Sequence, residues 1–531
     1  MGTRTNRFRE RVTTALKRAA SRQALRGELA SQTTPDDLRS RVREYSRGRR
    51  VIIASNREPY QHVRDDGGIR VIRSPGGLAS ALDSVARATG ATWVAQASGD
   101  ADQEAADAAG RVAVPPGVED YTLQRLWVNP EETANDFRRF TNGCLWPLCH
   151  VVYVRPHFVA SQWKAYRDVN AQFADAILAA AGNDPALVLL QDFHLACCAP
   201  ILRKKRPDLS IVMFWHIPWP NPEAFRILPW RRDVLEGLLA CDLLGFHINY
   251  HGMNFIDTVA LELEARVDRE RSAILRRGHR TFVRAYPIGP DAAEISMAAS
   301  DPSTIRAAQD IREALGIGDA RVILGVDRLD YTKGIPERLA AYELFLETHP
   351  SEAGRVAFVQ IGVPSRVDLP EYQALGASVE ESVQRLNRRF GGARGPIIHL
   401  ITRNLDFREL IPYYVLADVL AVTALHDGMN LVAKEYVAAK VNLDGVLILS
   451  PYTGAARELE HALQVSPYDA ELMAGVIGRA LAMPPTERAE RMRALREVVA
   501  SRNIYDWASK IFRDVRRLHI GPSRSGAMPR H

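Results

Sequence analysis

Short hydrophobic runs rich in β-branched residues alternate with longer segments of helical periodicity along most of this chain. After Arg50 the runs lie at residues 51–55, 92–96, 187–191, 211–215 and 243–247. Runs of this length separated by helical segments are typical of buried parallel strands joined by crossover helices. The pattern therefore predicts a doubly wound α/β domain.

The same alternation restarts at Arg321. Its hydrophobic runs occupy residues 322–326, 356–362, 397–401, 419–423 and 446–450. Prolines mark the starts of helices here, because Pro336 opens one helical segment and Pro485 opens another that reaches about Ala500. We therefore expect a second doubly wound domain.

The expected fold class is α/β, with two Rossmann-like doubly wound parallel-sheet domains that face each other across a cleft. We expect an N-terminal domain at residues 50–295 and a C-terminal domain at residues 296–518. Residues 1–49 are expected to form a basic extension, helical or disordered, that chemistry does not require, and residues 519–531 a disordered tail. Ligands of open parallel sheets bind beyond the carboxyl ends of the strands, so we expect the site between the two domains.

Length and composition agree with this organisation. A chain of 531 residues is too long for one compact core, and 46% hydrophobic with 25% charged residues is typical of a globular protein. The hydrophobic runs are far shorter than the roughly 20 residues of a spanning helix. With a basic start that lacks an apolar stretch, the chain is expected in the cytoplasm. Its five cysteines show no CxxC spacing and are expected to be reduced.

The net charge of +6 does not indicate a nucleic-acid-binding body. Residues 1–50 hold 14 Lys and Arg against 5 Asp and Glu, a surplus of nine, so the remaining residues carry a net charge of −3. The basic segment is expected to be solvated, with contact to an anionic surface as the alternative. Nucleic acid and membrane partners are therefore not expected, and the oligomeric state stays open, a homo-oligomer included.

The common nucleotide-binding motifs are missing from the sequence. Neither a G-x-G-x-x-G after a strand nor a G-x-x-x-x-G-K-[ST] is present, which disfavours a dinucleotide enzyme or a P-loop NTPase. Instead the first strand leads to Arg57, and a Gly76-Gly77 pair then opens a helix. These groups could approach an anion, although Pro-Gly-Gly alone is more often only a turn.

The second domain carries a stronger set of candidates. Arg328 and Lys333 follow its first strand, where two cations suit a diphosphate, with a surface ion-pair loop as the alternative. After the run at 419–423 come Asp427, which can hold a sugar hydroxyl, and a helix with Glu435, which can accept from a ribose. Lys434 is expected to face solvent.

In the first domain, Asp192 and His216 both follow predicted buried strands and are expected to point into the cleft. Their functional and structural interpretations carry about equal weight. His247 and His251 have the i, i+4 spacing of metal ligands, but no nearby carboxylate completes a set. We therefore expect no metal site.

Eight segments in order carry a resemblance to a known family: NGCLWPLCH, QDFHL, FWHIPWP, GFH, VDRLDYTKG, DGMNLVAKEYVAA, GVLILSPYTGAARELEHAL and SPYD. Over roughly residues 50–515 the chain resembles the trehalose-6-phosphate synthase family of retaining glycosyltransferases. The resemblance implies the two-domain GT-B fold. It also implies transfer of glucose from a nucleotide diphosphate, UDP-glucose being expected, to glucose 6-phosphate, with no cofactor or metal.

The resemblance also implies residue roles. The catalytic set would be Asp192, His216, Arg328, Lys333 and Asp427. The donor would be held by Gly77, His216, Arg328, Lys333, Asp427, Gly428, Met429, Asn430, Leu431 and Glu435. The acceptor would be held by Arg57, Phe137, Trp146, Asp192 and Arg366.

Three positions depart from the family pattern. Phe137 stands where a Tyr is usual nine residues before Trp146, Gln96 stands near an expected Trp, and His426 replaces the usual Arg before DGMN. Phe137 has no hydroxyl with which to bind a phosphate. The alternatives are therefore a glucosylglycerol-phosphate synthase, a pseudo-glycosyltransferase with another phosphorylated acceptor, and a catalytically silent regulatory protein. The residues leave the donor base open.

Overall fold

The structure is a computed structural model that describes residues 32–518 apart from residues 47, 66, 74–76 and 393–394. Its first domain is built on a ten-stranded sheet, parallel in its centre and antiparallel at both edges. The spatial order of the strands is β10 (Arg266–Asp268), β11 (Ala273–Arg276), β12 (His279–Ala285), β9 (Leu243–Phe246), β8 (Ser210–Phe214), β7 (Ala186–Gln191), β1 (Arg50–Arg57), β4 (Thr92–Gln96), β6 (Tyr121–Leu126) and β5 (Arg111–Val114).

Both faces of this sheet are covered, because alternate residues of each strand enter different cores. On β1, Val51 and Ile53 pack into a core shared with α3, while Ile52 and Ala54 pack into the core around α7. A separate hairpin of β2 (Tyr60–Asp65) and β3 (Gly68–Arg73) follows β1. The helical segments of this domain are α2 (Pro35–Ser46), α3 (Gly77–Thr89), α4 (Asp102–Ala105), α5 (Glu131–Phe140), η1 (Thr141–Leu145), α6 (Trp146–His150), α7 (Ala160–Ala181), η2 (Phe193–Leu195), α8 (Ala199–Lys205), α9 (Pro222–Phe225), α10 (Arg231–Leu238) and α11 (Asn249–Glu262).

The second domain contains a six-stranded sheet whose neighbours all pair in parallel. Its order is β15 (Ile398–Ile401), β14 (Val356–Val363), β13 (Arg321–Arg328), β16 (Val419–Val422), β17 (Val446–Leu449) and β18 (Leu463–Gln464). Its helical segments are α12 (Ala292–Ser300), α13 (Pro302–Ala314), η3 (Tyr331–Lys333), α14 (Ile335–Thr348), η4 (Pro350–Glu352), α15 (Pro370–Phe390), α16 (Phe407–Leu416), α17 (Leu431–Ala439), η5 (Gly454–Arg457), α18 (Ala470–Ala482), α19 (Pro485–Ser501) and α20 (Ile504–Arg517).

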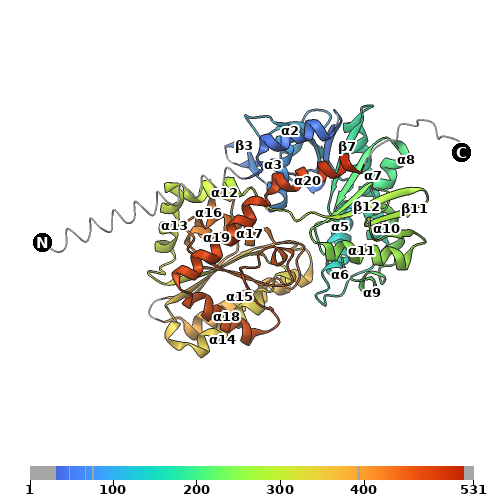
Figure 1. The fold of residues 1–531 in the computed structure, drawn as a ribbon. Helices are drawn as coiled ribbons and strands as arrows, with labels where there is room; N and C mark the ends of the chain where they lie inside the picture. Colours follow the sequence, from blue (N-terminus) through green and yellow to red (C-terminus); the bar gives the residue numbers. More distant parts are fainter. Residues whose placement is uncertain (1–31, 47, 66, 74–76, 393–394, 519–531) are drawn as a thin grey trace, which may run out of the picture.

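The last helix joins the two domains. Figure 1 shows α20 in red, running from the second domain towards the first, where it packs against α2 and α3. The Tyr286 hydroxyl donates to Asp514 of α20 at 2.8 Å. Although α20 follows the second sheet in the chain, it therefore contributes to the core of the first domain as well. The domain limits given by residue number stay a prediction.

Part of the basic N-terminal segment belongs to the folded body. Helix α2 buries Leu38 and Val42 in the same core that contains α3 and α20. The rest of α2 is polar, as in a solvated segment, so the sequence pattern alone does not reveal the buried face. The predicted features of residues 1–31 and 519–531 lie outside the described residues.

The expectation for Lys434 of α17 was wrong. Lys434 does not face solvent, because its side chain is 1% exposed. Its Nζ donates to the Ile288 backbone carbonyl at 2.7 Å and pairs with Glu458, which in turn accepts from Arg502 at 2.8 Å. Lys434 therefore ties α17 to the segment that connects the domains.

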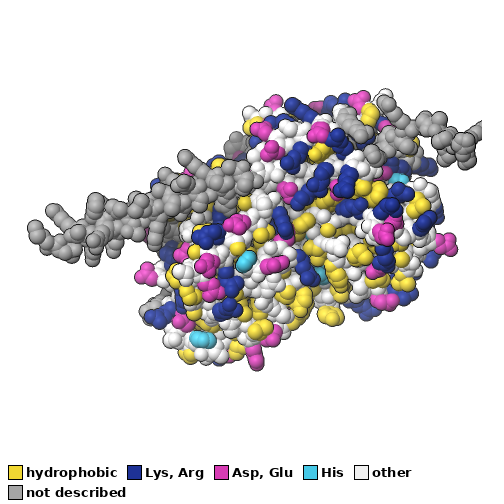
Figure 2. Space-filling view, viewed as in Figure 1, with side chains coloured by type: hydrophobic (Ala, Val, Ile, Leu, Met, Phe, Trp, Pro, Cys, Tyr) yellow, Lys and Arg dark blue, Asp and Glu magenta, His cyan; other side chains and the backbone are white. Residues whose placement is uncertain are grey.

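The surface of the described chain mixes both signs of charge. Figure 2 shows basic and acidic side chains interspersed over the face in view. No helix within the described residues is long and apolar enough to cross a membrane.

Candidate active site

The polar residues singled out in the sequence meet where the two sheets face each other. Those of the first domain lie at the ends of β1, β7 and β8 or just after them, and those of the second lie likewise at β13, β14 and β16. All six strands are parallel members of their sheets, so the carboxyl ends of both sheets converge on one junction. The residues brought to it are Arg57, Asp192, His216, Arg328, Lys333, Arg366 and Asp427.

Two guanidinium groups of the second domain lie over Trp146 of the first, and a third, that of Arg57, lies within electrostatic reach of both. The guanidinium carbon of Arg366 lies 4.0 Å from the centroid of the Trp146 ring, and that of Arg328 lies 5.2 Å from it. The surrounding protein and the charges of Arg328 and Arg366 lower the pKa of Arg57 to about 10. Burial contributes most to this shift, and the two neighbouring guanidinium charges add to it, so the cluster is a site that favours an anion.

One buried carboxylate anchors part of this cluster. Asp330 is fully buried and accepts from Arg366 at 3.1 Å, with Arg328 at 3.4 Å. Arg366 also donates to Tyr372, and its backbone has a positive φ of 51°. Burial alone would raise the pKa of Asp330, but Arg366 and Arg328 lower it, so it stays ionised. One carboxylate among three guanidinium groups leaves a positive excess.

A second charged pair lies beside this cluster. Lys333 Nζ donates to Asp427 at 2.6 Å, and Asn430 donates to the same carboxylate at 3.2 Å. Burial would raise the pKa of Asp427, but the Lys333 charge outweighs it and holds this pKa at about 2. Gly334 adjoins Lys333, and a Cβ there would lie 2.1 Å from the Thr423 carbonyl oxygen, so only glycine allows this approach.

The loop after Asp427 lies against the first domain. A Cβ on Gly428 would lie 2.0 Å from the His216 carbonyl oxygen, so the absence of a side chain allows this contact between domains. Asn430, at a positive φ of 77°, caps α17 by accepting from the Ala433 N–H at 3.0 Å. Met429 is buried and Leu431 begins the helix. The segment predicted to hold the donor is thus a rigid loop at a helix start.

Glu435 lies one turn into α17 and is partly exposed. It accepts a hydrogen bond from the Tyr414 hydroxyl at 2.9 Å, and burial raises its pKa. A carboxylate with one free oxygen at a helix start is suited to accept from sugar hydroxyls.

Asp192 and His216 form a connected pair in the first domain. The His216 backbone N–H donates to Asp192 at 3.0 Å, and Asp192 has a positive φ of 73°. Burial raises the pKa of Asp192 to about 6. The His216 ring lies 2.8 Å by Nε2 from Gln191 Oε1, and burial lowers its pKa far enough to keep it neutral. The ring is therefore a hydrogen-bond donor to Gln191 and not a cation.

For the remaining predicted residues, Phe137, Gln96 and Gly77, the described part of the structure gives a position but no contact with the charged groups of the site. Phe137 is fully buried and stacks on Tyr166, 5.8 Å between centroids, so it presents no surface of its own to a ligand. Gln96 ends β4 in register with Arg57. Gly77 begins α3, while the residues just before it lie outside the described part. The roles of these three residues stay predictions.

Two residues of the junction, His194 and Asp330, were not singled out from the sequence, and His426 was noted only as a departure from the family pattern. His194 lies near the arginine cluster, where burial and then Arg366, Arg57 and Arg328 lower its pKa to about 3. His426 Nδ1 lies 2.7 Å from the His150 carbonyl oxygen and so links the two domains. Asp330 stands between Arg328 and Lys333 in the sequence, and this spacing was a signal that could have identified it.

The described residues contain no group of three or more His, Cys, Asp or Glu side chains that could hold a metal ion. His251 instead contacts the Trp219 carbonyl at 3.3 Å, while the ring of His247 lies 5.2 Å from that of His216. His247 follows β9 and His251 lies in α11, so the two residues do not share a helix and both pack at the domain junction.

Comparison with known proteins shows the family of this chain. Residues 49–517 match the model of Glycosyltransferase family 20. A trehalose-6-phosphate synthase from Mycolicibacterium vanbaalenii is 38% identical over 471 residues, which cover 87% of this chain and 95% of the relative. A trehalose-6-phosphate synthase from Mycobacterium leprae is 38% identical over 465 residues, 86% of this chain and 92% of the relative.

Solved structures share the fold of this chain, and two of them contain a sugar ligand. An α,α-trehalose-phosphate synthase (UDP-forming) from Burkholderia xenovorans in complex with glucose-6-phosphate has a TM-score of 0.78 at 31% identity, covering 88% of this chain and 100% of its own. A trehalose-6-phosphate protein from E. coli bound with UDP-2-fluoro glucose has a TM-score of 0.77 at 32% identity, covering 88% and 99%. The expected two-domain GT-B fold is therefore confirmed, and the chain belongs to glycosyltransferase family 20.

Proposed function

We propose that this protein transfers glucose, with retention of configuration, from UDP-glucose to glucose 6-phosphate, which yields trehalose 6-phosphate and UDP. The observation that carries the proposal is the convergence of three guanidinium groups and a Lys333–Asp427 pair at the junction of the two sheets. Relatives of similar length and fold bind a UDP-glucose analogue and glucose 6-phosphate. Two anionic ligands require two cationic subsites, and the cations gathered at the junction support this proposal.

The donor half of the site uses the second domain. Arg328 and Lys333 would neutralise the diphosphate as its negative charge grows in the transition state. Asp427, ionised and fixed by Lys333, would accept from the hydroxyls of the transferred glucose. Glu435 would hold the ribose, and residues 428–431 would lie along the diphosphate. Cations on the protein would then perform the work of a bound metal, so we propose that no metal is required.

The acceptor half spans both domains. Arg57 and Arg366 would bind the phosphate of glucose 6-phosphate by charge-assisted hydrogen bonds, with Trp146 packed beneath them. Asp192, with its raised pKa, would hold the acceptor hydroxyl that attacks the glucose. His216, whose neutral ring donates to Gln191 through Nε2, would accept a hydrogen bond from a hydroxyl of the transferred glucose at Nδ1. The protein's expected place in the cytoplasm stays a prediction.

The proposal is tested by the rate of nucleoside diphosphate release with a panel of substrates. UDP-, GDP- and ADP-glucose are each combined with glucose 6-phosphate, glycerol 3-phosphate and glucose, with a chelator present throughout. We expect release only with a phosphorylated acceptor, fastest with UDP-glucose and glucose 6-phosphate. Preference for glycerol 3-phosphate would instead favour a glucosylglycerol-phosphate synthase, which the buried, hydroxyl-free ring of Phe137 makes a necessary comparison.

A further inference from the structure

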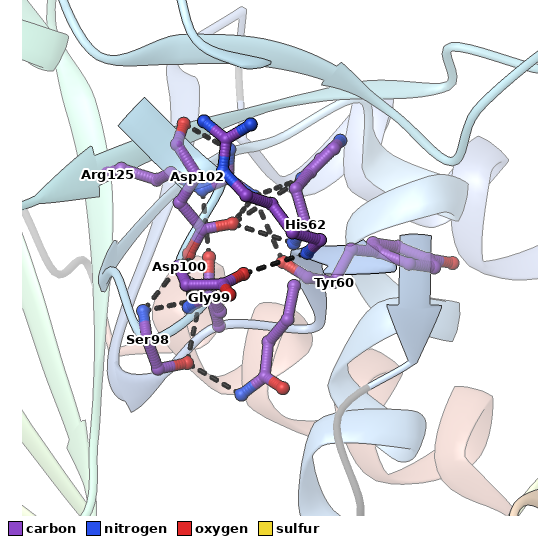
Figure 3. Close-up of polar contacts among 10 residues, drawn as sticks. Tyr60, His62, Ser98, Gly99, Asp100, Asp102 and Arg125 are labelled. Carbon is purple, nitrogen blue, oxygen red and sulfur yellow. Dashed lines mark hydrogen bonds and ion pairs between the residues drawn. The ribbon is translucent and has the colours of Figure 1, made fainter. Parts of the chain in front are cut away.

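A buried polar network lies directly behind Arg57. Glu58, Asp102 and Arg125 have side chains that are completely buried, although all three are charged residue types. Figure 3 shows Asp102 and Arg125 close to His62 and the loop at Ser98 and Gly99. Buried charges are costly unless they are paired, so such a cluster is retained only where its geometry matters.

Glu58 connects the end of β1 to two other elements. Its Oε2 accepts from Arg125 Nε of β6 at 2.9 Å. Its Oε1 accepts from both the backbone N–H and the hydroxyl of Ser98, each at 2.8 Å. The carboxylate therefore fixes the chain immediately after Arg57 to β6 and to the loop that follows β4.

Asp102 completes the network from the start of α4. It accepts from the backbone N–H groups of Gly99 at 2.7 Å and His62 at 2.8 Å, and pairs with Arg125 at 2.7 Å. Gly99 must lack a side chain here, since a Cβ would lie 2.3 Å from the His62 carbonyl oxygen. The network thus also locks the β2–β3 hairpin against the sheet.

The network holds two carboxyl groups for one guanidinium. Burial and a hydrogen bond with Asp102 raise the pKa of Glu58 to about 7 despite Arg125. Burial opposes the ionised form of Asp102, but hydrogen bonds from Glu58 and from the backbone lower its pKa. Burial and then the Arg125 charge lower the pKa of His62, so its Nδ1 accepts from Arg125 at 2.7 Å. Below about pH 7, Glu58 therefore holds its proton while Arg125 balances the charge of Asp102.

The position of Arg57 depends on its backbone, because its own side chain makes few contacts with the protein. Within the described residues its guanidinium group has no hydrogen bond or ion pair to the protein. Side chains alternate along an extended chain, so Arg57 points outwards while Glu58 points into the network. The Arg57 carbonyl is held by the Ser55 hydroxyl at 2.7 Å, which in turn accepts from Trp93.

We propose that Glu58 is a positioning residue that, through Ser98 and Arg125, holds Arg57 where it binds the phosphate of the acceptor. This inference rests on the proposed function of Arg57. Glu58 touches no substrate and acts only by fixing the backbone of its neighbour.

The test compares Glu58→Ala with the wild type in Michaelis constants for both substrates. We expect the KM for glucose 6-phosphate to rise about tenfold, the scale of one weakened charge-assisted contact, with kcat and the KM for UDP-glucose within about twofold. Ser98→Ala, which removes a single hydroxyl donor to Glu58, should shift the same constant in the same direction. Ser98→Ala provides the test if Glu58→Ala does not fold. Glu104→Gln, at an exposed pair with Arg64 beside the network, is the matched control and should change neither constant.

A double variant separates positioning from general loosening. In an Arg57→Ala background, Glu58→Ala should raise the KM for glucose 6-phosphate no further, because its only route is through Arg57. The inference would be overturned if the rises in KM of the two single variants multiplied in the double variant. It would also be overturned by an unchanged KM in a folded Glu58 or Ser98 variant, or by an equal rise in KM for both substrates. The dissociation constant for inorganic phosphate, measured on the same variants, is independent of turnover. If the wild type does not use glucose 6-phosphate but loses phosphate binding in Glu58→Ala, the proposed function fails and the positioning role stands.

Discussion

At the scale of single residues, the cations of the donor half are the most direct test of chemistry. We predict that Arg328→Ala and Lys333→Ala each lower kcat about 100-fold, the magnitude of losing one preorganised electrostatic contact. Lys333→Ala also leaves Asp427 buried without its partner. Steady-state rates measure the effect, and Lys205→Ala, at an exposed pair with Asp175, is the control. Near-wild-type kcat in both variants would remove the diphosphate assignment.

Single residues also show the limits of a sequence pattern. Arg328, Lys333 and Asp427 could be placed at the site because each follows a hydrophobic run that forms a parallel strand. Lys434 could not be placed, since its partner Glu458 and the Ile288 carbonyl come from distant segments. The burial of Phe137 against Tyr166 likewise depends on how α5 and α7 pack. Tertiary contacts decided these positions, and local patterns do not contain them.

At the scale of elements, the network behind β1 predicts a pH dependence of stability. The pKa of Glu58 is raised from its ordinary 4.5 to about 7, so the folded state binds this proton more tightly than the unfolded chain. Its stabilising contribution is complete below about pH 4.5 and is lost as the pH rises to about 7. The lowered pKa of Asp102 acts below this window. The pKa of His62 is lowered from 6.5 by burial, so His62 contributes an opposite trend within the window, which the wild type and a Glu58 variant share.

Glu58→Gln removes this titration. The unfolding free energy of the wild type, measured by urea denaturation at pH 5, 6 and 7, should fall with pH more steeply than that of the variant. Glu104→Gln should keep the wild-type slope. Parallel slopes for the wild type and Glu58→Gln would show that Glu58 is ionised throughout.

Helix α17 provides a second prediction at this scale. Lys434→Met removes a buried cation that joins α17 to the Ile288 carbonyl and to Glu458. We expect a loss of about 3 kcal/mol in unfolding free energy, the low end for breaking a buried pair, since Glu458 keeps Arg502. Denaturation curves measure it, with Lys510→Met at a more exposed pair as the control. A loss below about 1 kcal/mol would mean that the contacts of Lys434 contribute little to the free energy of unfolding.

The hydrophobic pattern predicts most strands of both sheets, but it does not predict those in the margins of the first sheet. Strands β1, β4, β7, β8 and β9 and all the long strands of the second sheet coincide with the predicted runs. The strands β5, β6, β10, β11 and β12 were not predicted, because their residues alternate between buried and exposed or carry many arginines. Of these, β5 and β10 form the edges of the first sheet, and β6, β11 and β12 lie between the edges and the parallel centre. Strands in such antiparallel margins need only one apolar face, so they lack a continuous hydrophobic run.

At the scale of the whole molecule, α2 and α20 bind the ends of the described chain to the first domain. A chain that begins at residue 47 should be less stable than one that begins at residue 32, because the shorter chain loses the buried Leu38 and Val42 of α2. Each such side chain contributes about 1.5–3 kcal/mol. Thermal unfolding of the two truncated chains measures the difference. Equal midpoints would show that α2 adds nothing to the fold.

The account as a whole rests on the identity of the product. The most direct measurement is the NMR spectrum of the sugar formed from UDP-glucose and glucose 6-phosphate by the full chain in the presence of a chelator. Retention of configuration and an acceptor bound through its phosphate predict one product, trehalose 6-phosphate, with both anomeric carbons in the α configuration. No product, a β-linked product, or a product formed only from an unphosphorylated acceptor would contradict the account.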